Sequence, residues 1–139
     1  MSGEASTTRT AIAHGPKGSA GGANSPFTTR QLSRLDEALT LSSLESGLAF
    51  SVYVGELAAP TRAHAEALFE KLGPDSVLVA VSPGLRCLHI VTGDDSAKRL
   101  PNRACALAAL AMRAAFSNGD LTGGITIGLR MLADSAGRA

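Results

Sequence analysis

Apolar side chains recur every three or four residues along four stretches of the chain, which is the spacing of helices that bury one face. These stretches predict helices over residues 28–46, 60–72, 102–116 and 121–136. Thr28 or Thr29 is a suitable N-cap for the first helix, and Gly47 is a natural stop for it. Asp120 is a suitable N-cap for the last helix.

Three other stretches have the apolar patterns of β-strands. In LAFSVYV, residues 48–54, large apolar residues occupy alternate positions, so one side of the strand is strongly apolar. SVLVAVS, residues 76–82, is apolar on both sides, which predicts a central strand. Pro83 and Gly84 form a turn dipeptide, and LRCLHIVTG, residues 85–93, then completes a β-hairpin with the central strand.

The predicted order of elements is α-β-α-β-β-α-α, which indicates an α/β fold. We expect a three-layer α/β/α sandwich whose small mixed sheet contains the β-hairpin and carries helices on both faces, because the central strand is apolar on both sides. A chain of 139 residues suits one domain. We place that domain at residues 27–137 and expect residues 1–26, which are rich in Gly, Ser and Ala, to be a disordered tail.

Composition excludes several classes of function. The formal net charge is +1 and no basic patch is interleaved with aromatic residues, which argues against nucleic-acid binding. No apolar run approaches the ~20 residues that span a bilayer, and the N-terminus has no hydrophobic signal segment, so we expect a cytoplasmic protein without a membrane span. Cys87 and Cys105 are the only cysteines. They cannot assemble a zinc quartet, and we expect two buried, reduced thiols.

Three segments carry a resemblance to a known family. They are SVYVGEL in the first strand, VLVAVSPGLRCLHIVTG through the hairpin, and FSNGDLTGGITIGLRML leading into the last helix. Together they resemble the TPM domain family, which is named for a thylakoid lumen protein, a photosystem II repair protein and a receptor modulator. The resemblance covers nearly all of residues 30–136 and is closest to an uncharacterised actinobacterial branch. It implies an α/β/α sandwich, and some members are described as acid phosphatases or divalent-cation binders.

The chain departs from the acidic pattern of that family. Typical members carry a tGxGxE segment after the hairpin, followed by an Asp a few residues later. Here the segment is TGDDSAK, in which Gly93 is kept but Ala97 stands near the position of the Glu. Asn102 stands where the next Asp is expected. These departures argue against phosphatase activity in this chain.

Asp94, Asp95 and Asp120 are the candidate metal ligands. Asp94 and Asp95 follow a strand end, where α/β folds commonly place ligands, and carboxylate oxygens suit Ca²⁺ or Mg²⁺. The alternative is that these residues only cap the turns and helices that follow them. No other cofactor is expected, and no catalytic residue is assigned.

Two glycines and one histidine have structural interpretations. Gly124 and Gly128 lie one turn apart on the last helix and are expected to pack against the Ala-rich helix at Ala108, Ala111 or Ala115. His89 is expected to be a packed or edge histidine of the hairpin, because no catalytic motif surrounds it.

These observations favour a non-enzymatic TPM-like module that binds another protein or its own copy. The support is the absence of an assembled catalytic set, the near-neutral charge and the altered acidic segment. A divalent-cation-dependent phosphatase using Asp94, Asp95 and Asp120 is the alternative. A calcium-binding domain without catalysis is the third hypothesis.

Overall fold

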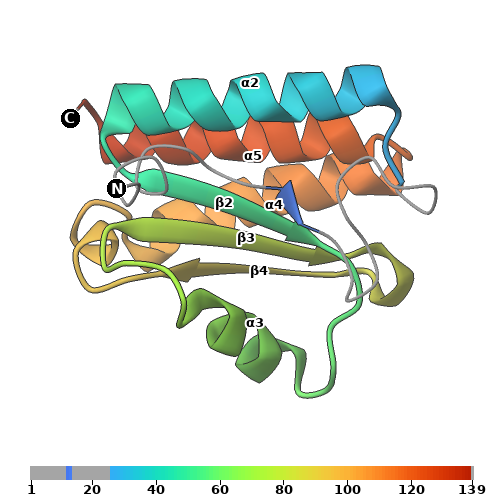
Figure 1. The fold of residues 1–139 in the computed structure, drawn as a ribbon, viewed down its shortest axis with the longest axis horizontal. Coiled ribbons are helices and arrows are strands. Elements are labelled where there is room, and N and C mark those ends of the chain that lie inside the picture. The colour runs from blue at the N-terminus through green and yellow to red at the C-terminus, as the bar shows by residue number, and fades with distance from the viewer. Residues whose placement is uncertain (1–11, 14–25, 139) are drawn as a thin grey trace.

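The computed structural model describes residues 12–13 and 26–138, and it has the predicted α/β class. The helices are α2 (Thr29–Ser46), α3 (Thr61–Phe69), α4 (Asn102–Ser117) and α5 (Leu121–Ala136), and the strands are β1 (Ile12–Ala13), β2 (Ala49–Val54), β3 (Ser76–Ser82) and β4 (Cys87–Thr92). One face of the sheet is covered by α3 and the other by α2, α4 and α5 (Figure 1). The predicted three-layer sandwich is therefore confirmed.

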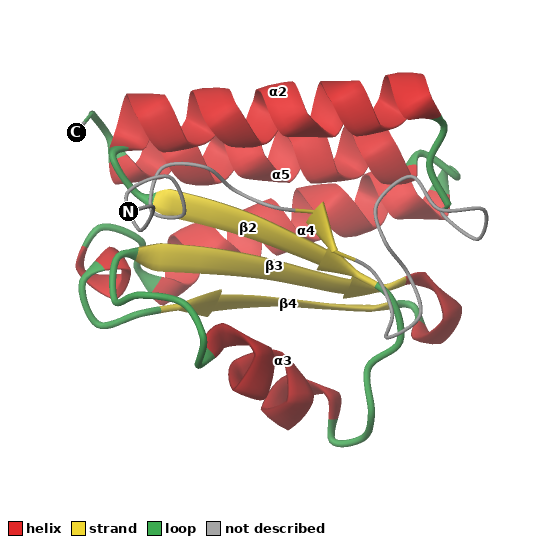
Figure 2. Ribbon diagram, in the orientation of Figure 1, coloured by secondary structure: helices red, strands yellow, loops and turns green. Residues whose placement is uncertain are grey.

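The sheet is mixed and has the strand order β1-β2-β3-β4 (Figure 2). β2 and β3 are parallel and are joined through α3, whereas β3 and β4 form the predicted antiparallel hairpin. All seven residues of β3 are buried, because helices cover both faces of this central strand.

A short strand lies within the segment that the sequence predicts to be a tail. Ile12 and Ala13 pair in parallel with Val52 and Tyr53 of β2, so β1 adds a fourth strand at that edge. The rest of the predicted tail, residues 1–11 and 14–25, lies outside the described residues. Its disorder stays a prediction.

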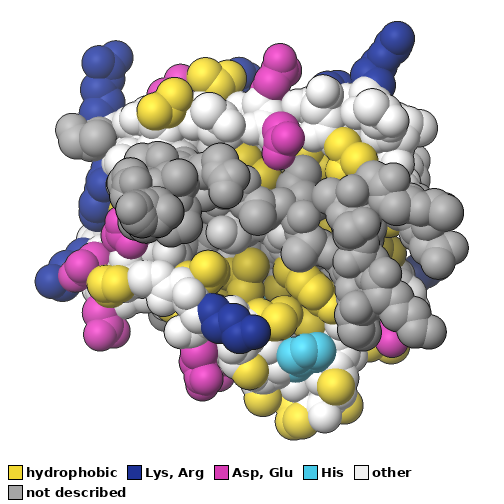
Figure 3. All heavy atoms as spheres, viewed as in Figure 1, with side chains coloured by type: hydrophobic (Ala, Val, Ile, Leu, Met, Phe, Trp, Pro, Cys, Tyr) yellow, Lys and Arg dark blue, Asp and Glu magenta, His cyan; other side chains and the backbone are white. Residues whose placement is uncertain are grey.

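Charged side chains of both signs are interspersed around the rim of the face shown in Figure 3. This distribution agrees with the net charge of +1, which leaves no strong field of one sign. In the described part of the chain, no helix is long and apolar enough to cross a bilayer.

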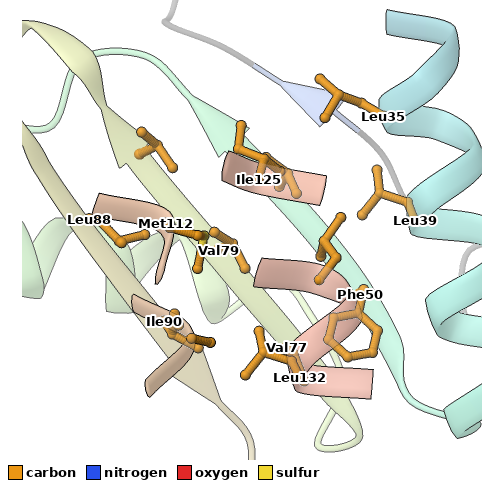
Figure 4. Packing of buried hydrophobic residues seen from close by; sticks show 14 of the residues in the cluster. Leu35, Leu39, Phe50, Val77, Val79, Leu88, Ile90, Met112, Ile125 and Leu132 are labelled. Atoms are coloured by element: carbon orange, nitrogen blue, oxygen red, sulfur yellow. The ribbon is translucent and has the colours of Figure 1, made fainter. Parts of the chain in front are cut away.

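The larger core lies between the sheet and the layer of three helices (Figure 4). Phe50 of β2 and Val79 of β3 face Leu39 of α2, Met112 of α4 and Ile125 of α5, and all five side chains are fully buried. A smaller core lies under α3, and its buried members are Leu57, Ala65, Leu78, Ala80 and Val91. Alternation along β2 and β3 divides their side chains between these two cores.

Two predicted helix caps are present. The hydroxyl of Thr28 accepts a hydrogen bond from the backbone of Gln31, and the side chain of Gln31 accepts one from the backbone of Thr28, which makes a capping box. The carboxylate of Asp120 accepts a hydrogen bond of 2.9 Å from the backbone of Gly123 at the start of α5.

Candidate functional site

A pocket of about 400 Å³ opens between the turn of the β-hairpin and the turn that joins α4 to α5. We call it the hairpin pocket, and its walls are residues 81–83 and 86–88 of the hairpin together with Arg113, Phe116, Ser117, Gly119 and Leu121. It lies at the carboxyl end of β3, which runs parallel to β2. Ligands of α/β sheets commonly bind at the carboxyl ends of parallel strands.

The hairpin pocket is positively charged. Arg86 and Arg113 line it, and none of its described lining residues is a carboxylate. The backbone of Arg86 has φ 55°, in the left-handed region, and its N–H donates a hydrogen bond to the carbonyl of Pro83. This conformation ends the turn Pro83–Leu85 and leads the chain into β4.

Ser82, the last residue of β3, borders the hairpin pocket. Ser82 is only 2% exposed, and its hydroxyl has no hydrogen-bond partner within residues 12–13 and 26–138. By the alternation along β3, its side chain lies on the α3 face of the sheet with those of Leu78 and Ala80, and not on the face that α4 and α5 cover. The guanidinium of Arg113 donates a long hydrogen bond of 3.5 Å to the carbonyl of Leu88.

A larger depression, of about 540 Å³, lies at the C-terminal end of α5 and is lined by residues such as Glu45, Asp134 and Arg138. Its lining mixes both signs of charge and includes Arg138, the last of the described residues. The hairpin pocket is therefore the better-defined candidate.

The three candidate metal ligands do not form one site. The backbone N–H of Asp95 donates to the carbonyl of Pro74, just before β3 begins, and Asp94 precedes it in the same loop. Asp120 follows the α4–α5 turn, which lines the hairpin pocket beyond the other end of β3. Seven strand residues span roughly 20 Å, which is too far for a shared ion.

Each of these carboxylates has a local explanation. Asp120 caps α5, and Asp95 pairs with Lys98 at 3.8 Å. Within the described residues, no group of three or more His, Cys, Asp or Glu residues is arranged to hold a metal ion. Nothing in the geometry of the described residues brings a third carboxylate to Asp94 and Asp95. Cation binding by these two residues alone stays a prediction.

Polar contacts tie β4, the edge strand, to the helices on either side. His89 Nε2 lies 2.8 Å from Thr61 Oγ1, and Arg62 donates a hydrogen bond of 3.1 Å to the carbonyl of Ile90. Burial, followed by the charges of Arg62 and Arg113, lowers the pKa of His89, so the neutral ring is favoured. Within the described chain no hydrogen bond orients the other ring nitrogen of His89. The contact therefore anchors α3, as expected for a packed edge histidine.

The two thiols are free, and they are half-buried rather than fully buried. Cys87 lies in the wall of the hairpin pocket. Burial raises the pKa of the Cys105 thiol, which makes that thiol less reactive.

Gly124 and Gly128 face α4, as predicted. A Cβ atom at Gly124 would lie 3.1 Å from Cβ of Ala115 and closer to the ring of Phe116. A Cβ atom at Gly128 would overlap the side chain of Met112. The partner of Gly128 is therefore a methionine, not one of the alanines that the sequence suggested.

Arg86 and Arg113 were not among the residues singled out from the sequence. A signal was present for Arg113, because it is one of only two charged residues on an Ala-rich helix. The sequence gives no such signal for Arg86. Its place in the pocket depends on a left-handed backbone conformation at the hairpin turn, and an arginine in the sequence does not predict that conformation.

A family model described as "Domain of unknown function (DUF5130)" matches residues 2–133 of the chain. The chain belongs to this family. An uncharacterised protein of Mycobacterium tuberculosis is 37% identical over 116 residues, which cover 82% of this chain and 68% of the relative. The family model reaches into the predicted tail, which β1 also does.

Two solved structures share the fold. The N-terminal domain of a protein from P. gingivalis has a TM-score of 0.74 at 14% identity, and the match covers 95% of this chain and 84% of that one. The BA42 protein from the psychrophilic Bizionia argentinensis has a TM-score of 0.71 at 13% identity, with 84% and 86% covered. At these identities the similarity establishes the fold alone.

Proposed function

We propose that this chain is a non-enzymatic, cytoplasmic TPM-like protein-interaction module whose partner is a second copy of itself. The resemblance of its hairpin and last helix to the TPM family supports the first part, and a mycobacterial relative agrees with an actinobacterial branch. The observation that carries the second part is a pair of outward helix faces with matching apolar residues and opposite charges.

The first of these faces belongs to α4. Leu107 is 49% exposed and Leu110 is 65% exposed, and the exposed Arg103 and Arg113 flank them along the same side of the helix. The helix contains no acidic residue. We call these four residues the basic face.

The second face belongs to the C-terminal half of α2. Leu41 is 57% exposed and Leu44 is 65% exposed, and the exposed Glu37 and Glu45 flank them. Figure 3 shows hydrophobic and acidic side chains together over this helix. We call these four residues the acidic face. No residue of either face forms an ion pair within the described chain.

The two faces complement each other in spacing as well as in charge. In each helix two leucines lie three residues apart, and a charged residue precedes the first leucine by four residues. Docking the acidic face of one copy on the basic face of another would therefore bury apolar side chains between pairs of opposite charge. The contact is heterologous, so a dimer still has one free face of each kind, and assemblies grow beyond a dimer unless they close into a ring.

Strand addition at β4 is less favoured as a mode of association. Arg62 from α3 and Arg113 from α4 occupy the outward carbonyls of Ile90 and Leu88. Covered groups of this kind protect an edge strand against pairing with another chain. An enzymatic function also has less support, because Asp94, Asp95 and Asp120 lie at opposite ends of β3.

Charge reversal tests the proposal. The variant Glu37→Lys/Glu45→Lys carries two basic faces, and the variant Arg103→Glu/Arg113→Glu carries two acidic faces. We expect sedimentation velocity to show that the natural chain gains mass as its concentration rises, more weakly at high salt. Each variant alone should stay monomeric, and an equimolar mixture of the two should associate again, since every contact then pairs opposite charges.

An apolar substitution and a matched control complete the experiment. Leu110→Ser should weaken association, whereas Leu85→Ser should not, because Leu85 is similarly exposed at 59% but lies on neither face. A natural chain that remains monomeric at every concentration would exclude self-association. Equal effects of the two serine variants, or no recovery in the mixture, would exclude these faces as the interface.

A further inference from the structure

We propose that the hairpin pocket is a binding site for a small amphiphilic anion, a molecule with an apolar body and one carboxylate or phosphate group. The inference shares only Arg113 with the self-association faces and concerns a different kind of ligand, so either proposal can fail without the other. Three features of the pocket support it: volume, apolar walls and unopposed positive charge.

The size and the walls of the pocket suit a small apolar group. Its volume of about 400 Å³ lies within the ~300–1,000 Å³ of known small-molecule sites. Val81, Leu88, Phe116 and Leu121 contribute apolar surface from the hairpin, from α4 and from the start of α5. A concave site with these walls favours a compact ligand over an extended peptide.

The polar groups of the pocket select an anion. Arg86 and Arg113 approach it from the hairpin and from α4, and the described lining residues include no acidic group that would neutralise them. Planar guanidinium groups bind carboxylates and phosphates through paired hydrogen bonds. The Arg86 side chain has no hydrogen bond or ion pair within the described chain, and the bond from Arg113 to Leu88 is long at 3.5 Å. Both cations are therefore available to a ligand.

NMR titration of the isotope-labelled full chain tests the proposal with four probes. Phenylacetate and phenyl phosphate combine a ring with a carboxylate or a phosphate, and the stronger binder of the two identifies the preferred anion. Benzyl alcohol has the ring without charge, and inorganic phosphate has the charge without the ring. We expect saturable shifts for at least one aromatic anion, confined to residues 82–88 and 113–121, and at least tenfold weaker binding of both partial probes.

Arginine variants localise the charge requirement at a protein concentration where the chain is monomeric. Arg86→Gln removes a side chain with no contact to maintain, and it should weaken binding of the aromatic anion at least tenfold. Arg113→Gln should do the same, whereas Arg103→Gln, an exposed arginine on the same helix but outside the pocket, should leave binding unchanged. The spectrum of each variant without ligand reports whether it is folded.

Three results would overturn the proposal. The first is the absence of saturable shifts with either aromatic anion. The second is that benzyl alcohol binds as tightly as the anions, which would show that the pocket binds apolar groups without selecting for negative charge. The third is an equal loss of affinity in the Arg86 and Arg103 variants, which would indicate general attraction to positive charge.

Discussion

A methyl group added at Gly128 should destabilise the domain, because the position faces a fully buried side chain that would have to shift. An ideal Cβ atom there would lie 2.6 Å from Cγ and Cε of Met112, well inside van der Waals contact. Met112 is 0% exposed, so it cannot swing into solvent. The substitution Gly128→Ala gains about 1 kcal/mol of helix propensity but incurs about 1–3 kcal/mol of overpacking. We expect a net loss of about 1 kcal/mol.

Urea unfolding followed by circular dichroism measures this loss and its cause. Gly124→Ala should cost less, since the ring of Phe116 is only half-buried and can rotate away, and Gly84→Ala should cost nothing, because no atom lies within 4 Å of its Cβ. In a Met112→Ala background the overlap is gone, so Gly128→Ala should become stabilising. Additive effects of Gly128→Ala and Met112→Ala, or a Gly128→Ala variant as stable as the natural chain, would refute the reasoning.

Three further predictions concern the carboxylates and the histidine. Asp120→Ala should lower the unfolding free energy by about 1 kcal/mol through the lost cap, with or without Ca²⁺, and Asp120→Asn should restore most of it. Millimolar Ca²⁺ or Mg²⁺ should leave Tm unchanged; a shift that Asp94→Asn/Asp95→Asn removes would instead establish a cation site. Because the pKa of His89 is lowered on folding, the unfolded chain takes up its proton first as the pH falls below 6.5, and stability should decline from there. Urea unfolding of His89→Gln across that range should show a flatter decline, and equal slopes would contradict the assignment.

The helices and the three longer strands could be predicted because the residues within each element carry its pattern. The continuous apolar run of β3 requires cover on both faces, and the glycine at position 47 and the aspartate at position 120 mark helix ends by capping chemistry that acts over a few residues. β1 could not be predicted in this way. Ile12 and Ala13 are too few to show a period, and their strand conformation depends on pairing with β2, which is distant in sequence.

The candidate sites depended on tertiary geometry that spacing does not reveal. Asp94 and Asp120 both stand beside turns, but β3 separates the two turns along its length. Conversely, Arg86 and Arg113 share a pocket only because α4 lies along β4, where Arg113 reaches the carbonyl of Leu88. The pocket wall is formed by a hairpin turn and a helix end together, so the sequence of neither segment alone predicts it.

The composition of α4 explains why both proposed surfaces involve this helix. Its inward residues are mostly small, and the glycines at positions 124 and 128 let α5 approach closely, so packing needs few large side chains from α4. Nothing in the fold therefore requires leucine at the exposed positions 107 and 110, where lysine or glutamate would keep the helix and cost no packing. Adjacent exposed leucines are a liability for solubility unless another surface covers them. Their presence between two arginines on an otherwise Ala-rich helix is most simply explained by a partner with apolar and acidic side chains, and the outward face of α2 on a second copy has both.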